Sequence, residues 1–80
     1  MQITLYCRPL CGWCEEAKEY LKKRGLPFSA VDVSRDPAAN QEMIRLSGQS
    51  YVPTLVADGR VLANFDVNQL KKFLGDIGES

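Results

Sequence analysis

The sequence predicts an α/β fold, in which a four-stranded mixed β-sheet is flanked by three α-helices. Short strand-like segments alternate with amphipathic helical segments through the first half of the chain. Two strand-like segments joined by a two-residue turn follow, and a third helical segment comes last. With 80 residues, of which 45% are hydrophobic, the chain has the size and apolar content of one small domain, which we predict to span residues 1–80.

The first half of the chain predicts a strand, a helix and a second strand. Residues 3–6 alternate in polarity and are rich in strand formers. Residues 12–24 place apolar side chains at helical spacing, with acidic residues early and basic residues late, and Gly25 follows as a residue that favours the end of a helix. Residues 28–33 predict the second strand. A β-α-β unit pairs its strands in parallel through a right-handed crossover.

Two further helices are predicted from their N-terminal caps. Asp36 and Pro37 suit an N-cap and a first helical residue, and that helix is predicted to run to Gly48. Asp66 begins the last helix, with Gln69 three residues later as a capping box requires. The apolar stripe of this helix consists of Leu70, Phe73, Leu74 and Ile77.

A β-hairpin is predicted between these two helices. Residues 54–57 and 60–63 are strand-like, and the Asp58-Gly59 pair between them favours a two-residue turn. Because a hairpin pairs its strands antiparallel, the complete sheet is mixed. Val52-Pro53 comes directly before the first hairpin strand, where a proline does not interrupt the hydrogen-bond ladder. Base rates alone favour a trans peptide bond at this proline.

Charge and composition exclude several classes of function. Ten Lys and Arg balance ten Asp and Glu, and a chain without net positive charge is a poor match for nucleic acid or an anionic membrane surface. No apolar run approaches the roughly 20 residues that span a bilayer. The N-terminus starts on a strand-like alternation rather than a signal peptide, so we expect a cytoplasmic protein, and we expect a monomer. The chain has no histidine, the usual general base and commonest metal ligand.

Three cysteines lie within eight consecutive residues, and two of them form a C-x-x-C at the start of a predicted helix. The free N–H groups and partial positive charge of a helix N-terminus favour a thiolate at Cys11, and the thiolate is the species that attacks a disulfide. Cys14, one turn inside the helix, is expected to be less exposed and to resolve the mixed disulfide. Arg8 adds a positive charge that supports the thiolate and suits a substrate carboxylate. Cys11 and Cys14 are therefore predicted to be a redox-active pair that forms a disulfide bond.

Other uses of these cysteines stay open. A structural zinc site needs four ligands, and the chain has no histidine and no second C-x-x-C. A zinc or iron–sulfur site shared between two chains is an alternative, as is a domain that keeps the fold without redox activity. We expect no bound metal. Cys7 is either a small half-buried residue or a third thiol that exchanges disulfides with Cys11 or Cys14.

In combination these features resemble the glutaredoxin family. The resemblance covers residues 3–73, and it rests on a strand, Arg8-Pro9-x-Cys11-x-x-Cys14, a helix, Val52-Pro53 before a hairpin, and Asp66 at the start of the last helix. It implies a thioredoxin fold with Cys11 as nucleophile and Cys14 as resolving thiol. It also implies a cis bond at Val52-Pro53, whose Val52 backbone would pair with an extended disulfide substrate or with glutathione.

The resemblance further implies a glutathione site, with glutathione as electron donor and co-substrate. Arg8 and Gln49 match polar residues for the glycine carboxylate of glutathione. Phe65 and Asp66 match the segment that binds its γ-glutamyl end at a helix N-terminus. The full set assigned to glutathione is Arg8, Trp13, Gln49, Val52, Pro53, Phe65 and Asp66.

Three places depart from the usual residues of the family. Ala63-Asn64 stands where members usually have two glycines, Gly12-Trp13 stands where Pro-Tyr or Pro-Phe separates the cysteines, and Cys7 replaces a common Ser or Thr. A side chain at Asn64 is expected to crowd a close backbone approach that glycine allows. With these departures, the sequence also resembles small glutaredoxin-like proteins that thioredoxin reductase recharges.

The predicted function is thiol–disulfide oxidoreduction in electron transport and cell redox homeostasis. The enzyme would be glutathione-dependent and would reduce protein disulfides or glutathione mixed disulfides. Two alternatives are recharging by thioredoxin reductase and an iron–sulfur carrier in which Cys11 and glutathione ligate a cluster between two chains. Disulfide-containing protein partners are expected to dock on an exposed apolar rim formed by Tyr6, Pro9, Leu10, Trp13, Tyr51 and Phe65.

Overall fold

Strands and helices follow one another in the predicted order in a computed structural model that describes residues 2–77. Residues 1 and 78–80, which the predicted domain 1–80 includes, lie outside the described residues. The elements are β1 (Ile3–Cys7), α1 (Gly12–Lys23), β2 (Ser29–Asp32), α2 (Pro37–Ser47), β3 (Thr54–Ala57), β4 (Arg60–Ala63) and α3 (Val67–Asp76). The second strand is shorter at both ends than predicted, because only four of its residues pair with β1.

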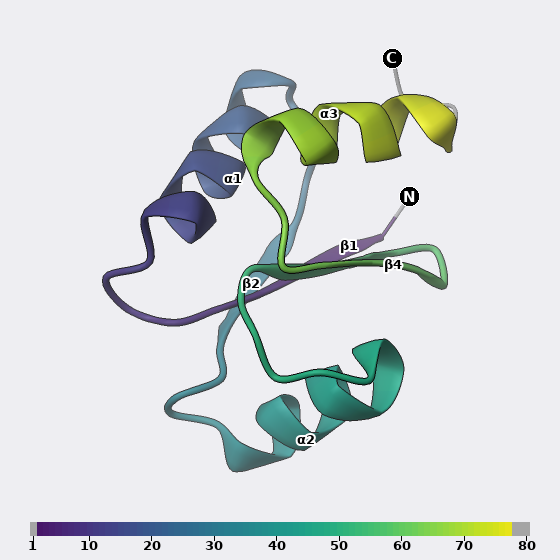
Figure 1. Ribbon diagram of the computed structural model, residues 1–80. Helices are drawn as coiled ribbons and strands as arrows, with labels where there is room; N and C mark the ends of the chain where they lie inside the picture. Colours follow the sequence, from purple (N-terminus) through teal and green to yellow (C-terminus); the bar gives the residue numbers. More distant parts are fainter. Residues whose placement is uncertain (1, 78–80) are drawn as a thin grey trace.

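The four strands form one mixed sheet in the order β2-β1-β3-β4. β1 pairs with β2 in parallel, and the pairs β1–β3 and β3–β4 are antiparallel. Helices α1 and α3 lie on one face of the sheet and α2 lies on the other, as Figure 1 shows. The predicted arrangement of a four-stranded mixed sheet flanked by three helices is therefore confirmed.

The helix ends confirm the capping residues expected from the sequence. The Asp36 carboxylate accepts a hydrogen bond from the Ala39 N–H at 3.1 Å. At α3, Asp66 and Gln69 form a complete capping box with two reciprocal hydrogen bonds of 2.9 Å. Gly25, with φ 68°, follows α1 in the left-handed conformation that glycine adopts at low cost.

The hairpin turn between β3 and β4 also follows from its two central residues. Asp58 has φ 49° and Gly59 has φ 82°, and two positive φ angles define the turn whose twist matches paired strands. The Asp58 carboxylate accepts a hydrogen bond from the Gln2 N–H at 3.1 Å. This contact ties the hairpin to the start of β1.

The apolar core is divided by the sheet into two layers. The layer beneath α1 and α3 contains the larger cluster, whose large and fully buried members are Leu5, Leu21, Leu55, Phe65, Leu70 and Leu74. The layer beneath α2 contains Tyr6, Val33 and Met43. Because successive residues of a strand face opposite sides, Ile3, Leu5 and Cys7 point toward α1 and α3, whereas Tyr6 points toward α2. Among the described residues, no helix is long and apolar enough to cross a membrane.

Candidate active site

The strand register brings the predicted site residues to one end of the sheet. Tyr6 pairs with Thr54, and Thr54 pairs with Ala63. The chain that leaves β1, the chain that enters β3 and the chain that leaves β4 therefore meet at the same end. Arg8 and the cysteines come from the first segment, Val52-Pro53 from the second, and the residues before α3 from the third.

Cys11 is the N-cap residue of α1. Its Sγ accepts a hydrogen bond from the Cys14 N–H at 3.2 Å, as the oxygen of a Ser or Asp N-cap would. The side chain is partly exposed. A thiolate at this position would meet an N–H donor and the positive end of the helix while staying accessible to a substrate.

Cys14 is the buried partner of this thiol pair, as predicted. Its side chain is fully shielded from solvent on the inner face of α1. Burial, together with its hydrogen bond to the Cys11 sulfur, raises the pKa of Cys14 to about 12, against the opposing effect of the Arg8 backbone. The two thiols therefore differ. The Cys11 sulfur is accessible and accepts a hydrogen bond at the helix N-terminus, whereas the Cys14 thiol is buried and stays protonated.

The raised pKa of Cys14 predicts that the reduced protein loses stability in alkaline solution. The thiol has a pKa of 9.0 when unperturbed and about 12 when folded, so the folded state holds a proton that the unfolded state releases. Its contribution is fully present below pH 9 and is lost as the pH rises toward 12, by up to about 1.4 kcal/mol per pH unit. Urea unfolding between pH 8 and 10.5 measures this loss. The Cys14→Ala variant should lose less stability over this interval, and parallel curves for the two proteins would contradict the assignment.

Cys7 is buried more completely than the half-buried residue expected from the sequence. It is 4% exposed, because the side chain points inward at the end of β1. Its thiol donates a hydrogen bond to the Val31 carbonyl at 3.4 Å, and burial raises the pKa of Cys7. All three cysteines are free thiols in this structure. The Cys11–Cys14 disulfide of the oxidised protein stays a prediction, and so does disulfide exchange through Cys7.

The loop before β3 is held by a hydrogen-bond network around Gln49. The amide of Gln49 donates to Ser47 Oγ at 2.9 Å and to Thr54 Oγ1 at 3.0 Å, and its Oε1 accepts from the Tyr51 N–H at 2.7 Å. Thr54 is fully buried and donates in turn to the Tyr51 carbonyl at 2.8 Å. Sequence reasoning did not identify Thr54 as a site residue. The available signal was a hydroxyl residue directly after Pro53, at a position where the strand pattern faces inward.

Val52-Pro53 has the cis peptide bond implied by the family resemblance, whereas base rates favoured trans. The Pro53 carbonyl accepts a hydrogen bond from the Asn64 N–H at 2.8 Å, which joins this loop to the segment after β4. Asn64 has φ 54°, in the left-handed region where asparagine is tolerated better than most residues. Within the part of the chain that the structure describes, no hydrogen bond uses the Val52 backbone.

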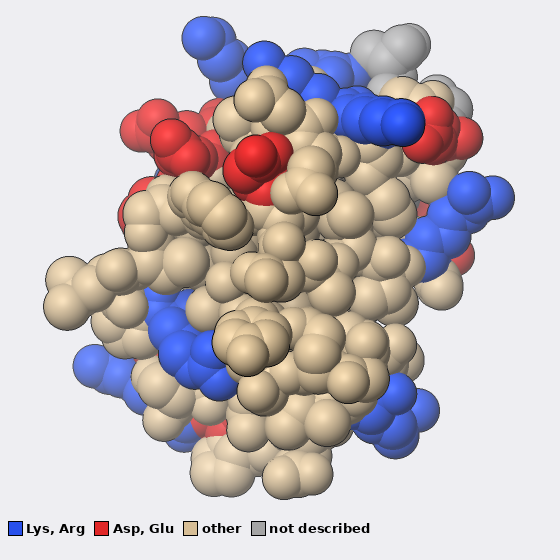
Figure 2. Space-filling view, viewed as in Figure 1, with Lys and Arg blue, Asp and Glu red and all other residues tan. Residues whose placement is uncertain are grey.

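The exposed apolar rim is smaller than predicted. Leu10, Trp13 and Tyr51 are 104%, 50% and 64% exposed, and Pro9 is exposed beside them. The prediction was wrong for Tyr6 and Phe65. Tyr6 faces α2 across the sheet, and Phe65 turns inward ahead of α3, so both are core residues. Figure 2 shows a broad uncharged surface across this view of the molecule, with acidic side chains gathered over α1.

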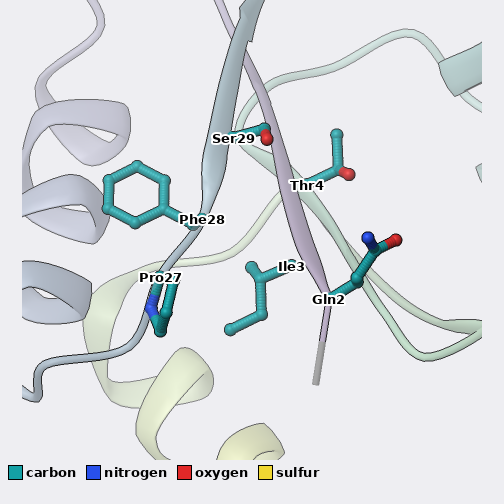
Figure 3. Close-up of a pocket in the computed structure, with 6 residues that line it drawn as sticks. All are labelled: Gln2, Ile3, Thr4, Pro27, Phe28 and Ser29. Atoms are coloured by element: carbon teal, nitrogen blue, oxygen red, sulfur yellow. The ribbon is translucent and has the colours of Figure 1, made fainter.

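A hollow elsewhere on the surface carries none of this chemistry. Figure 3 shows a pocket lined by residues at the starts of β1 and β2, namely Gln2, Ile3, Thr4, Pro27, Phe28 and Ser29. Its volume is about 250 Å³. It lies at the start of β1, whereas Cys11 follows the end of that strand. Across residues 2–77, no three His, Cys, Asp or Glu side chains are grouped to hold a metal ion.

Comparisons with known proteins agree with this geometry. The sequence profile of the glutaredoxin family matches residues 3–62. An uncharacterized glutaredoxin-like 8.6 kDa protein in the rubredoxin operon of Clostridium pasteurianum is 38% identical over 72 residues, which are 90% of this chain and 96% of the relative. The glutaredoxin-like protein NrdH of Escherichia coli is 35% identical over 57 residues, which are 71% of this chain and 69% of the relative.

Solved structures extend the likeness to the three-dimensional fold. The NrdH-redoxin structure from Escherichia coli covers 90% of this chain and 93% of its own, with a TM-score of 0.75 and 29% identity. A crystal structure of a thioredoxin-like protein covers 90% of this chain and 99% of its own, with a TM-score of 0.82 and 33% identity. The predicted thioredoxin fold is confirmed. The family profile, the relatives and the C-x-x-C at a helix start agree, and the chain belongs to the glutaredoxin family of thiol redox proteins.

Proposed function

We propose that this protein reduces disulfide bonds in other proteins and that thioredoxin reductase, rather than glutathione, returns it to the dithiol state. The observation that carries the proposal is the unlike pair of thiols at the start of α1. Cys11 is accessible and receives a hydrogen bond from the helix N-terminus, whereas Cys14 is buried and protonated.

This pair supports reduction in two exchange steps. The Cys11 thiolate attacks one sulfur of the substrate disulfide, so a mixed disulfide forms and one substrate thiolate leaves. Cys14 then loses its proton to solvent, and its sulfur attacks Cys11 Sγ. The second substrate thiolate leaves, the substrate has gained two electrons, and the protein holds a Cys11–Cys14 disulfide.

The surroundings of Cys11 suit an extended polypeptide substrate. Val52 has a backbone without a hydrogen-bond partner among the described residues, at the same end of the sheet as Cys11. Leu10, Trp13 and Tyr51 surround that end with exposed apolar side chains. Main-chain pairing and apolar contacts together can bind a peptide without a deep pocket.

Two features weaken glutathione as the electron donor. The side chain of Gln49, expected to hold a glutathione carboxylate, already uses its amide within its own loop. At the start of α3, the Asp66 carboxylate and its N–H are both engaged by Gln69, which leaves fewer free groups for a γ-glutamyl end. The NrdH-redoxin of Escherichia coli, whose structure resembles this one, is described as having a thioredoxin-like activity profile.

Glutathione is the second candidate donor because of Arg8. Arg8 is partly exposed, precedes Cys11 by three residues and takes part in no ion pair within the described part of the chain. A free guanidinium there suits the carboxylate of glutathione. The assignment of Arg8, Trp13, Gln49, Val52, Pro53, Phe65 and Asp66 to glutathione stays a prediction.

The electron source can be decided with a coupled assay on the oxidised protein. One arm contains thioredoxin reductase and NADPH, the other contains glutathione, glutathione reductase and NADPH, and both contain insulin as the protein disulfide. We expect NADPH oxidation to be at least about tenfold faster in the first arm, because the groups predicted to bind glutathione are occupied. Faster turnover in the glutathione arm would overturn the choice of donor, and no turnover in either arm would overturn the proposed reduction.

A further inference from the structure

We propose that Lys18 is a positioning residue for the resolving step: its ammonium group stabilises the negative charge that develops on the buried Cys14 sulfur. The inference rests on the proposed function and adds a residue to the same site. It assigns a task to a charged side chain that the two exchange steps do not otherwise use.

The placement of Lys18 follows from the helix. Cys14 and Lys18 are four residues apart in α1, so they lie on the same face in adjacent turns. The Lys18 side chain is only 27% exposed, whereas Lys22 and Lys23 farther along the helix are exposed. It therefore lies along the edge of the buried stripe that Cys14 begins, rather than extending into solvent.

One contact and one charge effect define the environment of the ammonium group. Glu15 Oε2 lies 3.0 Å from Lys18 Nζ, and it holds the side chain back toward the start of the helix. On the facing strand β1, the Cys7 side chain is buried. The hydrogen bond to Glu15 raises the pKa of Lys18, and the Lys18 charge lowers the pKa of Cys7 against the larger effect of burial. Lys18 is thus a cation at the buried thiols.

The resolving step needs such a cation. With a pKa of about 12, roughly one Cys14 thiol in 10⁵ is ionised at pH 7. The charge of Cys14 raises the pKa of Lys18, which places the two groups within electrostatic reach of each other. Besides burial, the pKa of Cys14 is affected by Cys11 at the helix start, Cys7 on β1 and the Arg8 backbone. A second thiolate would oppose ionisation, and the Arg8 N–H favours it. Lys18 contributes a positive charge one helical turn away, offset in part by the Glu15 carboxylate, in a setting that water screens only in part.

The two exchange steps can be followed separately with 5,5′-dithiobis(2-nitrobenzoate). In the first step, Cys11 attacks the reagent, forms a mixed disulfide and releases one thionitrobenzoate. In the second step, Cys14 loses its proton, attacks Cys11 Sγ and releases the second thionitrobenzoate. Both releases are read by absorbance in a stopped-flow instrument, so each protein supplies its own control for the first step.

We expect Lys18→Met to slow the second release about 3- to 10-fold at pH 7, the equivalent of about half to one pKa unit, with the first release changed less than about twofold. In this variant, the rate of the second release should also begin to rise only at a higher pH than in the unmodified protein. Lys18→Arg should restore most of the rate, since it keeps the charge. Lys22→Met is the matched control on the same helix and should leave both releases unchanged.

The outcomes separate this inference from the proposed function. Absence of both releases in the unmodified protein would reject the thiol exchange itself. Two normal releases in Lys18→Met, or equal slowing by Lys18→Met and Lys22→Met, would reject the role of Lys18 and leave the exchange intact. Slowing that Lys18→Arg fails to restore and that does not change with pH would indicate a packing effect, and it would also reject the proposal.

Discussion

Replacement of Cys11 by serine is expected to lower protein disulfide reduction by at least about three orders of magnitude, because it removes the nucleophile of the first step. The serine hydroxyl is a far weaker nucleophile than a thiolate, and Cys14 is too buried to take its place. The fold should be unaffected. Serine is a favoured N-cap residue, so its oxygen can accept the Cys14 N–H in place of the sulfur. The loss is measured as the rate at which the protein, first reduced with dithiothreitol, reduces insulin.

Two companion variants locate the defect. Cys14→Ser should complete the first step and then stop, so that the mixed disulfide with substrate accumulates and is detected by mass spectrometry. Cys7→Ser should retain activity within about threefold, since the hydroxyl can still donate to the Val31 carbonyl. Substantial turnover by Cys11→Ser would overturn the assignment of the nucleophile. Loss of turnover in a folded Cys7→Ser protein would instead favour the alternative in which Cys7 exchanges disulfides.

Local patterns in the sequence predict most of the fold, because each helix and turn has its own chemical signal. Asp36 and Asp66 identify helix starts through hydrogen bonds to N–H groups three residues on, and both bonds are present. Asp58-Gly59 predicts the hairpin because both residues tolerate positive φ. The predicted ends of the second strand were less accurate. Its limits are set by pairing with β1, a contact between segments far apart in the sequence.

The burial of Cys14 in the thiol pair was also predictable from a local pattern, whereas the exposure of the apolar rim was not. The burial of Cys14 follows from its place one turn inside a helix whose inner face also carries Ala17 and Leu21. Exposure of Tyr6 and Phe65 depends instead on which sheet face or helix each side chain meets. Phe65 lies outside any regular periodicity, between β4 and α3, so no pattern identified its inward direction.

One departure from the family pattern, Asn64, combines a backbone conformation typical of glycine with a side chain that glycine lacks. Asn64 stands where members usually have glycine, and its backbone adopts φ 54°. Asn64 thus adopts the left-handed conformation that glycine favours, and its N–H donates to the Pro53 carbonyl. A side chain is nevertheless added next to the start of α3. In this chain the segment after β4 therefore joins the Val52-Pro53 loop while it carries a side chain where a glutathione-binding surface was predicted.

Phe65→Ala is expected to cost about 3–5 kcal/mol of folding free energy, the typical range for removing a buried phenylalanine. The Phe65 side chain is fully shielded and belongs to the core layer beneath α1 and α3. A domain of this size has a total stability of about 4–12 kcal/mol, so the variant should be largely unfolded or should melt at a much lower temperature. Urea unfolding followed by circular dichroism measures the change.

Phe65→Ala should also disturb the active site in the molecules that remain folded. Phe65 lies between Asn64, which hydrogen-bonds to the Pro53 carbonyl, and Asp66, which caps α3. A cavity at this position loosens the segment that joins the cap to the Val52-Pro53 loop. Phe65→Leu, which keeps most of the apolar volume, should recover more than half of the lost stability. Leu10→Ala is the matched exposed control and should change stability by less than about 0.5 kcal/mol. A similar loss of stability in Phe65→Ala and Leu10→Ala would contradict the inward placement of Phe65. It would indicate that the Phe65 side chain belongs to the exposed apolar rim, as first predicted.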